Sequence, residues 1–355
     1  MEGKEYIRSL VRPNIRALVP YSSAREEFSG QAKIYLDANE NPYNDPLNRY
    51  PDPVQRPLKE AIAGIKQQPV ENLFLGNGSD EGIDLLIRVF CTPGKDQVVT
   101  VDPTYGMYTV CAAIQDVEHK QVLLRPDFSL DADAVIRAVE PRTKIVFLCS
   151  PNNPTSNSYE PEAMERIIDQ VNCIVVVDEA YIDFSRREGL LSMVSRKWNL
   201  VVLQTLSKAW GLAGIRLGMV FGHPELIGFL SRVKYPYNIN ALTIGRALEG
   251  LADPDAHAAW VRQTLEERER MNGRMSDFPM VEKVHPSDAN FLLVKMKDPQ
   301  DVQRYLMEQG IIVRDRSSVP LCEGSLRITV GTPSENEALY EALTNYSENK
   351  QQAQP

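Results

Sequence analysis

The first candidate for covalent chemistry in this sequence is a lysine that follows an apolar run typical of a buried strand. Lys208 lies in the segment Thr205-Leu-Ser-Lys-Ala-Trp-Gly-Leu-Ala-Gly-Ile-Arg-Leu-Gly218. A lysine that is buried or lies near other cations has a lowered pKa, and its free amine forms a Schiff base with an aldehyde. We therefore predict that Lys208 is a catalytic nucleophile. The alternative is an ordinary lysine on a surface loop.

The residues around Lys208 predict a binding site for phosphate. Thr205 and Ser207 supply hydroxyl donors, Arg216 supplies positive charge, and nearby glycines allow the backbone to approach a ligand closely. A cofactor that carries both an aldehyde and a phosphate, and that a lysine anchors, is pyridoxal phosphate. The segment is therefore interpreted as a pyridoxal-phosphate site.

A carboxylate ends another apolar run. The segment Val175-Val-Val-Asp-Glu-Ala-Tyr181 places Asp178 at the end of a predicted strand. A carboxylate beside a pyridine nitrogen keeps the ring protonated, and the protonated ring stabilises a carbanion. Asp178 is the predicted partner of that nitrogen. The alternative is a strand-end aspartate with only a structural hydrogen bond.

A glycine turn between a predicted strand and a predicted helix is a second candidate for phosphate binding. It lies in Leu73-Phe-Leu-Gly-Asn-Gly-Ser-Asp-Glu81, which apolar residues at helical spacing follow. Ser79 or Asp80 is expected to cap the helix, and free backbone N–H groups at a helix start favour a phosphate. Capping without any ligand is the alternative.

The elements that must position these residues alternate between short apolar runs and longer helical segments from about residue 70 to 225. This pattern predicts an α/β domain with a mostly parallel, buried sheet, whose ligand crevice lies beyond the carboxyl ends of the strands. A charged segment at about 255–275 is predicted to be a helix with a solvated charged face that connects to a smaller C-terminal domain. The predicted strands are 98–101, 144–149, 173–177, 200–203 and 217–221.

The lysine segment resembles the signature of the fold-type I aminotransferases, which depend on pyridoxal phosphate. The resemblance covers nearly the whole chain, from Val19-Pro-Tyr21 and Leu36-Asp-Ala-Asn-Glu-Asn-Pro42 to Leu326-Arg-Ile-Thr-Val-Gly-Thr332. It implies a large domain, residues 46–250, with a mostly parallel central sheet sandwiched by helices. It also implies a smaller α+β domain built from both chain ends, residues 1–45 and 251–355.

The resemblance further implies a set of cofactor contacts. Tyr105 is implied to stack on the cofactor ring, and Tyr181 and Asn153 to face its phenolic oxygen. Tyr50 is implied to reach the phosphate in the neighbouring subunit of a homodimer. Many relatives have glycine where this chain has Ser156, directly after the segment Ser150-Pro-Asn-Asn-Pro-Thr155. Because glycine would serve the backbone conformation there, the change concerns the geometry of the loop that carries Asn153. The remaining residues implied to hold the cofactor are Gly78, Ser79, Asp80, Asp178, Thr205, Ser207, Lys208 and Arg216.

Within the family, the resemblance is closest to the histidinol-phosphate aminotransferases of histidine biosynthesis. It implies transamination of histidinol phosphate with 2-oxoglutarate, which gives imidazole-acetol phosphate and glutamate. Tyr21, Asn39, Arg314 and Arg327 are implied to bind the substrates. Because a bidentate arginine suits both carboxylate and phosphate, Arg327 alone does not separate these two classes of donor. Arg314 and Tyr21 favour the phosphate.

Three other functions are compatible with parts of this pattern. A lyase resembling threonine-phosphate decarboxylase would release carbon dioxide from O-phosphothreonine. An aromatic or broad-range amino-acid aminotransferase would accept phenylalanine, which has no phosphate. A regulatory module that only binds the cofactor would need an added DNA-binding domain or a lost lysine, and Lys208 is present.

Composition narrows the partners to small molecules. The 48 acidic and 39 basic residues give a net charge of -9, which opposes binding to nucleic acid or to an anionic membrane. No apolar run reaches membrane-spanning length, and the N-terminus lacks a secretory apolar region, so we predict a cytoplasmic protein. The five scattered cysteines and four dispersed histidines predict neither disulfides nor a metal site.

Overall fold

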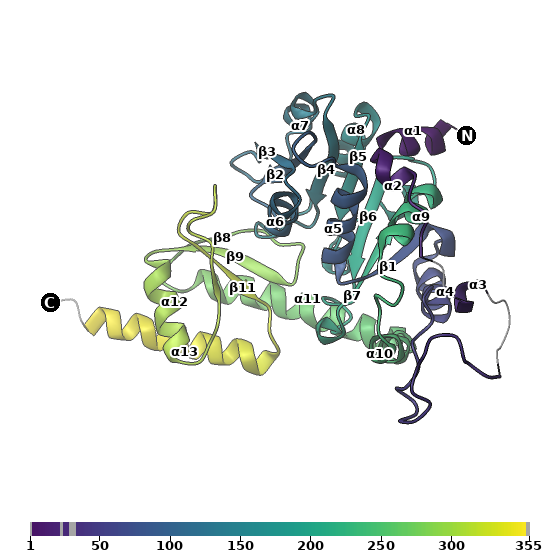
Figure 1. Ribbon diagram of the computed structural model, residues 1–355. Coiled ribbons are helices and arrows are strands. Elements are labelled where there is room, and N and C mark those ends of the chain that lie inside the picture. The colour runs from purple at the N-terminus through teal and green to yellow at the C-terminus, as the bar shows by residue number, and fades with distance from the viewer. Residues whose placement is uncertain (1, 22–23, 28–32, 353–355) are drawn as a thin grey trace.

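The apolar runs of the sequence form the middle of a seven-stranded sheet with the order β1-β7-β6-β5-β4-β2-β3 (Figure 1). The computed structural model describes residues 2–21, 24–27 and 33–352. All strands of this sheet run in one direction except β7, which pairs antiparallel with β6 and β1. The strands are β1 (Leu73–Asn77), β2 (Gln97–Asp102), β3 (Glu118–Leu123), β4 (Thr143–Cys149), β5 (Ile174–Asp178), β6 (Leu200–Thr205) and β7 (Leu217–Phe221).

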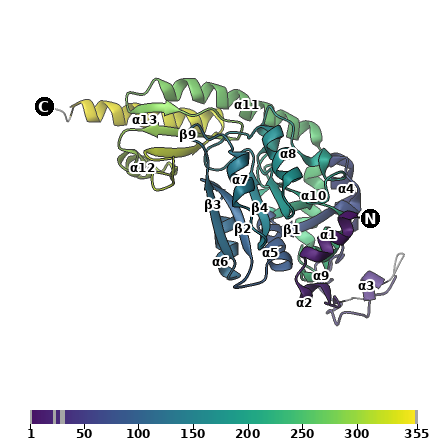
Figure 2. The ribbon, with the colours of Figure 1, turned by 90° about the horizontal axis from the view of Figure 1, so that it is seen from above.

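Both faces of the central strands are buried. In β5, Val175 and Val177 belong to one apolar core, whereas Ile174 and Val176 belong to another, because successive side chains point to opposite faces of a sheet. Helices cover both faces (Figure 2). On the first face these are α4 (Arg56–Lys66), α7 (Ala132–Ala138), α8 (Pro161–Gln170) and α10 (Ala241–Leu251). On the second face they are α1 (Glu2–Leu10), α2 (Pro13–Arg16), α5 (Ser79–Phe90), α6 (Met107–Ile114) and α9 (Pro224–Val233).

A second, antiparallel sheet lies beside the first, with the order β10-β11-β9-β8. Three helices share one apolar core with this sheet, which gives the helix-on-sheet arrangement of an α+β unit. The strands are β8 (Val281–Val284), β9 (Phe291–Met296), β10 (Arg314–Asp315) and β11 (Ser325–Thr329), and the helices are α11 (Pro254–Ser276), α12 (Pro299–Glu308) and α13 (Pro333–Gln352).

Helix α11 runs from the large sheet to the small one (Figure 1). The prediction that its charges form a wholly solvated face is wrong for Glu267 and Arg268, which are 5% and 2% exposed. Arg268 donates hydrogen bonds to the carbonyls of Phe184 (3.1 Å) and Ala289 (3.0 Å). A buried guanidinium needs such acceptors, because an unpaired buried charge is costly. Arg268 therefore ties the loop after β5 to the loop before β9.

The N-terminal helices lie with the large sheet. Ile7 of α1 and Ile15 of α2 join the core that also contains α9. The division into residues 46–250 and residues 1–45 with 251–355 stays a prediction. Among the described residues, no helix is both long and apolar enough to cross a membrane. The remaining elements are α3 (Ala24–Glu27) and the short 3-10 turns η1 (Val70–Asn72), η2 (Ile182–Phe184), η3 (Leu191–Met193) and η4 (Ala213–Ile215).

Candidate active site

A cavity of about 920 Å³ lies at the carboxyl ends of β2, β4, β5 and β6 and extends to the small sheet. Most of the predicted site residues line it together, although they come from distant parts of the chain. The structure thus places the polar strand ends where an open α/β sheet binds its ligands. The predicted residues that line the cavity are Gly78, Ser79, Asp80, Tyr105, Asn153, Asp178, Tyr181, Thr205, Ser207, Lys208, Arg216, Arg314 and Arg327.

Lys208 follows β6 in the loop that leads to η4. Its Nζ lies 5.4 Å from the centroid of the Tyr181 ring. Burial lowers the pKa of Lys208, and the nearby Arg327 guanidinium lowers it further, whereas Asp178 acts in the opposite direction. A lowered pKa raises the fraction of free amine at neutral pH, which is the form that attacks an aldehyde.

Asp178 ends β5 in a buried position. It is 3% exposed and accepts hydrogen bonds from the Tyr108 hydroxyl (2.8 Å) and the Ala180 backbone N–H (3.1 Å). Burial raises the pKa of Asp178 to about 6, although these two hydrogen bonds favour the carboxylate. A protonated ring nitrogen beside Asp178 would favour the carboxylate further. The site therefore suits a cationic heterocycle.

Tyr108 was not predicted as a site residue. It lies on α6, fully buried, and its ring stacks on Phe147 with centroids 4.7 Å apart. Tyr105 contacts its edge at 5.7 Å and 86°, and the Tyr105 hydroxyl donates to Asp80 (3.0 Å). In the sequence, Tyr108 is one aromatic of an apolar helix, and only the fold shows that its hydroxyl reaches Asp178.

Asn153 joins the two sheets within the cavity. Its Nδ2 lies 3.5 Å from the Tyr181 hydroxyl, and its Oδ1 accepts a hydrogen bond from Arg327 of β11 (2.5 Å). The Arg327 guanidinium lies over the Phe291 ring, 5.4 Å from its centroid. One asparagine thus connects the end of the site near Lys208 with an anion-binding side chain of the small sheet.

The turn before α5 is shaped to hold a phosphate. Its N-cap is Gly78 (φ 75°), and no side chain caps the helix, so the expectation that Ser79 or Asp80 does so was wrong. The first N–H groups of this 12-residue helix are therefore not taken up by a cap, and they favour an anion. A Cβ on Gly218 would lie 2.1 Å from the Ser79 nitrogen, so β7 approaches this turn more closely than any other residue type allows.

Polar side chains on the other side of the turn complete the predicted phosphate-binding site. Arg216 donates to Asp80 (3.3 Å) and to the Ser207 hydroxyl (3.5 Å). The Thr205 hydroxyl donates to Ser207 (3.0 Å). Exposed backbone donors, two hydroxyls and one guanidinium fit the phosphate of the predicted cofactor, just as buried Asp178 fits its ring nitrogen.

The loop that carries Asn153 accommodates Ser156 in the left-handed conformation that favours glycine (φ 66°). The Ser156 hydroxyl donates to the carbonyls of Thr155 (2.6 Å) and Pro286 (3.2 Å), and its N–H donates to the Asn152 carbonyl (2.8 Å). These bonds offset the strain of a side chain in this conformation. The loop therefore forms without the glycine that many relatives have.

Three predicted residues do not line this cavity within one chain. Tyr21 is 70% exposed. Asn39 and Tyr50 line a separate hollow of about 540 Å³ beside the start of α10. The Tyr50 ring stacks on Tyr237, with centroids 4.4 Å apart. Their predicted roles stay predictions, and that of Tyr50 involves a second copy of the chain.

Known proteins share both this sequence and this fold. A family model described as aminotransferase class I and II matches residues 32–343. A histidinol-phosphate aminotransferase of Parabacteroides distasonis is 52% identical over 339 residues, which cover 96% of this chain and 98% of the relative. One of Bacteroides fragilis is 50% identical over 341 residues, which cover 96% of this chain and 99% of the relative.

The fold is similar to that of solved structures. The crystal structure of a histidinol-phosphate aminotransferase from Sinorhizobium meliloti, in complex with pyridoxal-5'-phosphate, aligns with a TM-score of 0.78. The alignment covers 85% of this chain and 83% of that chain at 24% sequence identity. This likeness supports the predicted fold class, with its mostly parallel sheet between two layers of helices.

The close approach at Gly218 leads to a first prediction. Gly218→Ala is expected to lower the free energy of unfolding by about 3 kcal/mol, because its Cβ would overlap backbone atoms that are unable to move aside. Gly228→Ala on α9 is the matched control, since a Cβ there meets nothing within 4 Å. The control is expected to raise stability by about 0.5 to 1 kcal/mol. Denaturant unfolding measures both, and equal effects would contradict the clash.

The burial of Asp178 leads to a second prediction. Because its folded-state pKa of about 6 is raised above 3.8, its stabilising contribution is present below the lower value and lost as the pH rises through the higher one. Asp178→Asn removes this loss, so the stability of the cofactor-free variant relative to wild type is expected to increase by about 2 kcal/mol between about pH 4 and about pH 7. A difference that is constant with pH in denaturant unfolding would contradict the burial argument.

Proposed function

The chain belongs to the aminotransferase class I and II family, and we propose that it transfers the amino group of histidinol phosphate to 2-oxoglutarate. The family and the named relatives confirm the predicted transaminase activity, the predicted fold class and pyridoxal phosphate as the cofactor. The products are imidazole-acetol phosphate and glutamate, which places the enzyme in histidine biosynthesis. Relatives that carry this enzyme's name match nearly the full length of the chain.

The substrate assignment is carried by one further observation, a pair of arginines at the edge of the cavity. Arg314 of β10 and Arg327 of β11 are directly opposite each other in the sheet and both line the cavity. Like charges directly opposite destabilise a pair of strands, so the arrangement calls for an anion between them. A phosphate ester provides more negative charge there than an α-carboxylate.

The residues that line the cavity have different proposed roles in the reaction. Bound pyridoxal phosphate supplies an electron sink that stabilises the negative charge left on the substrate Cα. Asp178 would keep the ring nitrogen protonated, and the protonated ring is the more effective electron sink. Lys208 would anchor the cofactor through its amine, and the same amine, once free, would take the Cα proton of the substrate and deliver it to the cofactor carbon C4′. Asn153 and Tyr181, whose polar groups lie 3.5 Å apart, would bind the phenolic oxygen of the ring.

The start of α5 and the loop after β6 would hold the cofactor phosphate. The backbone N–H groups at Gly78, Ser79 and Asp80 supply donors from the start of α5. Arg216 supplies the charge. Thr205 and Ser207 would supply hydroxyl groups, and Tyr105 would stack on the ring.

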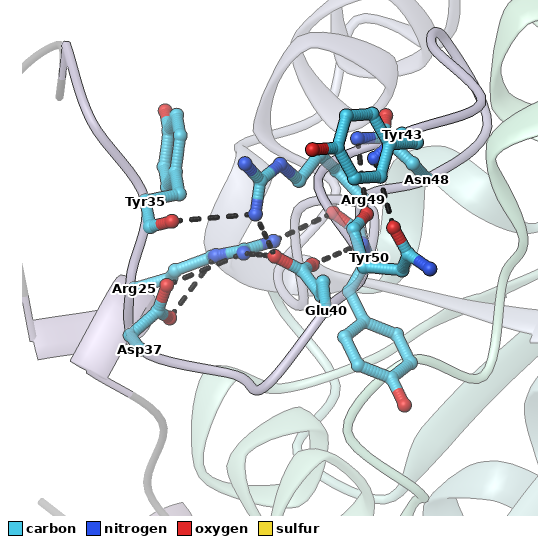
Figure 3. A network of polar contacts seen from close by, with 9 residues as sticks. Arg25, Tyr35, Asp37, Glu40, Tyr43, Asn48, Arg49 and Tyr50 are labelled. Carbon is cyan, nitrogen blue, oxygen red and sulfur yellow. Dashed lines mark hydrogen bonds and ion pairs between the residues drawn. The ribbon is translucent and has the colours of Figure 1, made fainter.

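The segment from residue 33 to 50 supports a homodimer in which Tyr50 completes the site of a second copy. It forms an ordered arm around the carboxylate of Glu40, whose side chain is 4% exposed (Figure 3). Glu40 accepts hydrogen bonds from Arg25 (2.5 Å), Arg49 (2.9 Å) and the Tyr50 backbone N–H (2.6 Å). These bonds fix the backbone of Tyr50 before any second copy is bound.

The same arm exposes apolar side chains that a second copy would cover. Leu36, Tyr43 and Ile34 are 92%, 79% and 76% exposed. A second copy packed against this arm would remove these apolar side chains from water. We also propose a cytoplasmic location, because the five cysteines are free and buried, as befits a reducing compartment.

The proposed function leads to a third prediction. When histidinol phosphate is added to the holoenzyme, the absorbance band of the lysine-linked cofactor is expected to disappear, and 2-oxoglutarate is expected to restore it. Lys208→Ala is expected to abolish turnover while circular dichroism shows the wild-type fold, since the variant lacks both anchor and base. Wild-type turnover by that variant would falsify the mechanism.

The same titration separates the alternative functions. A response to phenylalanine, with none to histidinol phosphate, would assign a broad amino-acid aminotransferase. Carbon dioxide release from O-phosphothreonine would assign a decarboxylase. Either result would keep the cofactor chemistry and replace the substrate.

The shared site leads to a fourth prediction. A mixed dimer of Lys208→Ala and Tyr50→Ala contains one complete site, which combines Lys208 of one chain with Tyr50 of the other. Co-refolding the two weak variants is therefore expected to recover activity well above the sum of the separate samples. A mixture of Lys208→Ala with Asp178→Asn is the matched control, because both residues lie in one chain's cavity and no complete site results. If Tyr50 acted within its own chain, the first mixture would recover nothing.

A further inference from the structure

A third arginine extends the pair that faces the cavity. Arg316 lies two residues after Arg314, and its backbone N–H donates to the Ser325 carbonyl (2.9 Å), one step beyond the pairing of Arg314 with Arg327. Because alternate residues of a strand share a face, Arg316 points to the same side as the other two. All three side chains line the cavity. Asp315, between them in sequence, does not line it.

The environment of Arg316 is unfavourable for a cation without a ligand. It is half-buried, and its Nε is buried without a hydrogen-bond partner. Within the described part of the chain, no carboxylate forms an ion pair with Arg314, Arg316 or Arg327. Burial, together with the charges of Arg327 and Arg314, lowers the pKa of Arg316 to about 10. The guanidinium stays charged at neutral pH, so the three arginines present positive charge that a bound anion would balance.

We propose that Arg316 is a specificity-determining residue that binds the phosphate of the amino donor and selects a phosphate ester over an α-carboxylate. This inference rests on the proposed function. A carboxylate has two oxygens, and one bidentate arginine satisfies them. A phosphate ester has three free oxygens and a charge close to -2, so it accepts hydrogen bonds from further guanidinium groups.

Arg327 and Arg316 lie at different places in the cavity and therefore have different proposed roles. Arg327 is bonded to Asn153, next to Tyr181, and so serves whichever anion is attached near the reacting carbon. Arg316 lies one step farther along the strand pair than Arg314 and adds donors that the α-carboxylate of glutamate does not need. The donor phosphate thus contacts arginines that the α-carboxylate leaves free.

The test compares the two half-reactions of the Arg316→Gln holoenzyme in single-turnover experiments. The rate constant divided by the dissociation constant is expected to fall by about 10- to 100-fold for histidinol phosphate, because charged hydrogen bonds are lost. For glutamate it is expected to change by less than about threefold. The inhibition constant of inorganic phosphate is expected to rise by about tenfold. Arg316→Lys keeps the charge and is expected to recover part of the loss.

Arg304→Gln is the matched control, because Arg304 is an exposed arginine of α12 that pairs with Asp301. It is expected to leave both half-reactions unchanged. An equal loss for histidinol phosphate and glutamate in Arg316→Gln, or no loss for either, would overturn the inference. If wild type itself ignored histidinol phosphate, the proposed function would fail first. The inhibition constant of phosphate, measured with any accepted donor, would then still decide the role of Arg316, and an unchanged value would overturn it.

Discussion

A parallel sheet that is buried on both faces leaves room for charged side chains only where its strands end. This constraint organises the whole protein. The middle residues of β4, β5 and β6 are apolar, and Asn153, Asp178 and Lys208 lie at or shortly after the carboxyl ends of these strands. Because parallel strands end at the same edge, residues that are far apart in sequence meet there without any dedicated scaffold. The antiparallel strand β7 adds Arg216 and Gly218 from the opposite direction.

The cavity concentrates positive charge in a protein whose net charge is -9. Arg216, Arg314, Arg316, Arg327 and Lys208 line it, and its acidic residues are fewer. Repulsion among these cations lowers the free energy of unfolding of the protein. A bound anion offsets that repulsion, so ligands stabilise the folded state. The distribution also explains why overall composition gives no hint of anion binding. The net charge sums over the whole chain, whereas anion binding depends on the few basic residues that line the cavity.

The sequence was sufficient to predict the central strands and the residues at their ends, because apolar runs and polar endings are local features. It did not reveal β3, whose residues Glu118–Leu123 are largely polar at the sheet edge. Tyr108 and Arg316 were missed for another reason. Their function depends on which residue lies opposite them in the fold, and no spacing along the chain encodes that. The helix cap at Ser79 or Asp80 was wrong because the chain turns one residue earlier, at Gly78.

The pattern of charges also gave a wrong prediction for Glu267 and Arg268. They lie in a charged helical segment that we expected to face solvent, but both are buried. The burial of Arg268 lets it link the two sheets. One guanidinium holds carbonyls from both sides of the junction, beside an apolar cluster that includes Phe184 and Phe291. Sliding the small sheet along the large one would break both hydrogen bonds. These two bonds therefore oppose a shift of the small sheet, which carries Arg314 and Arg327, relative to the large sheet, which leads into Lys208.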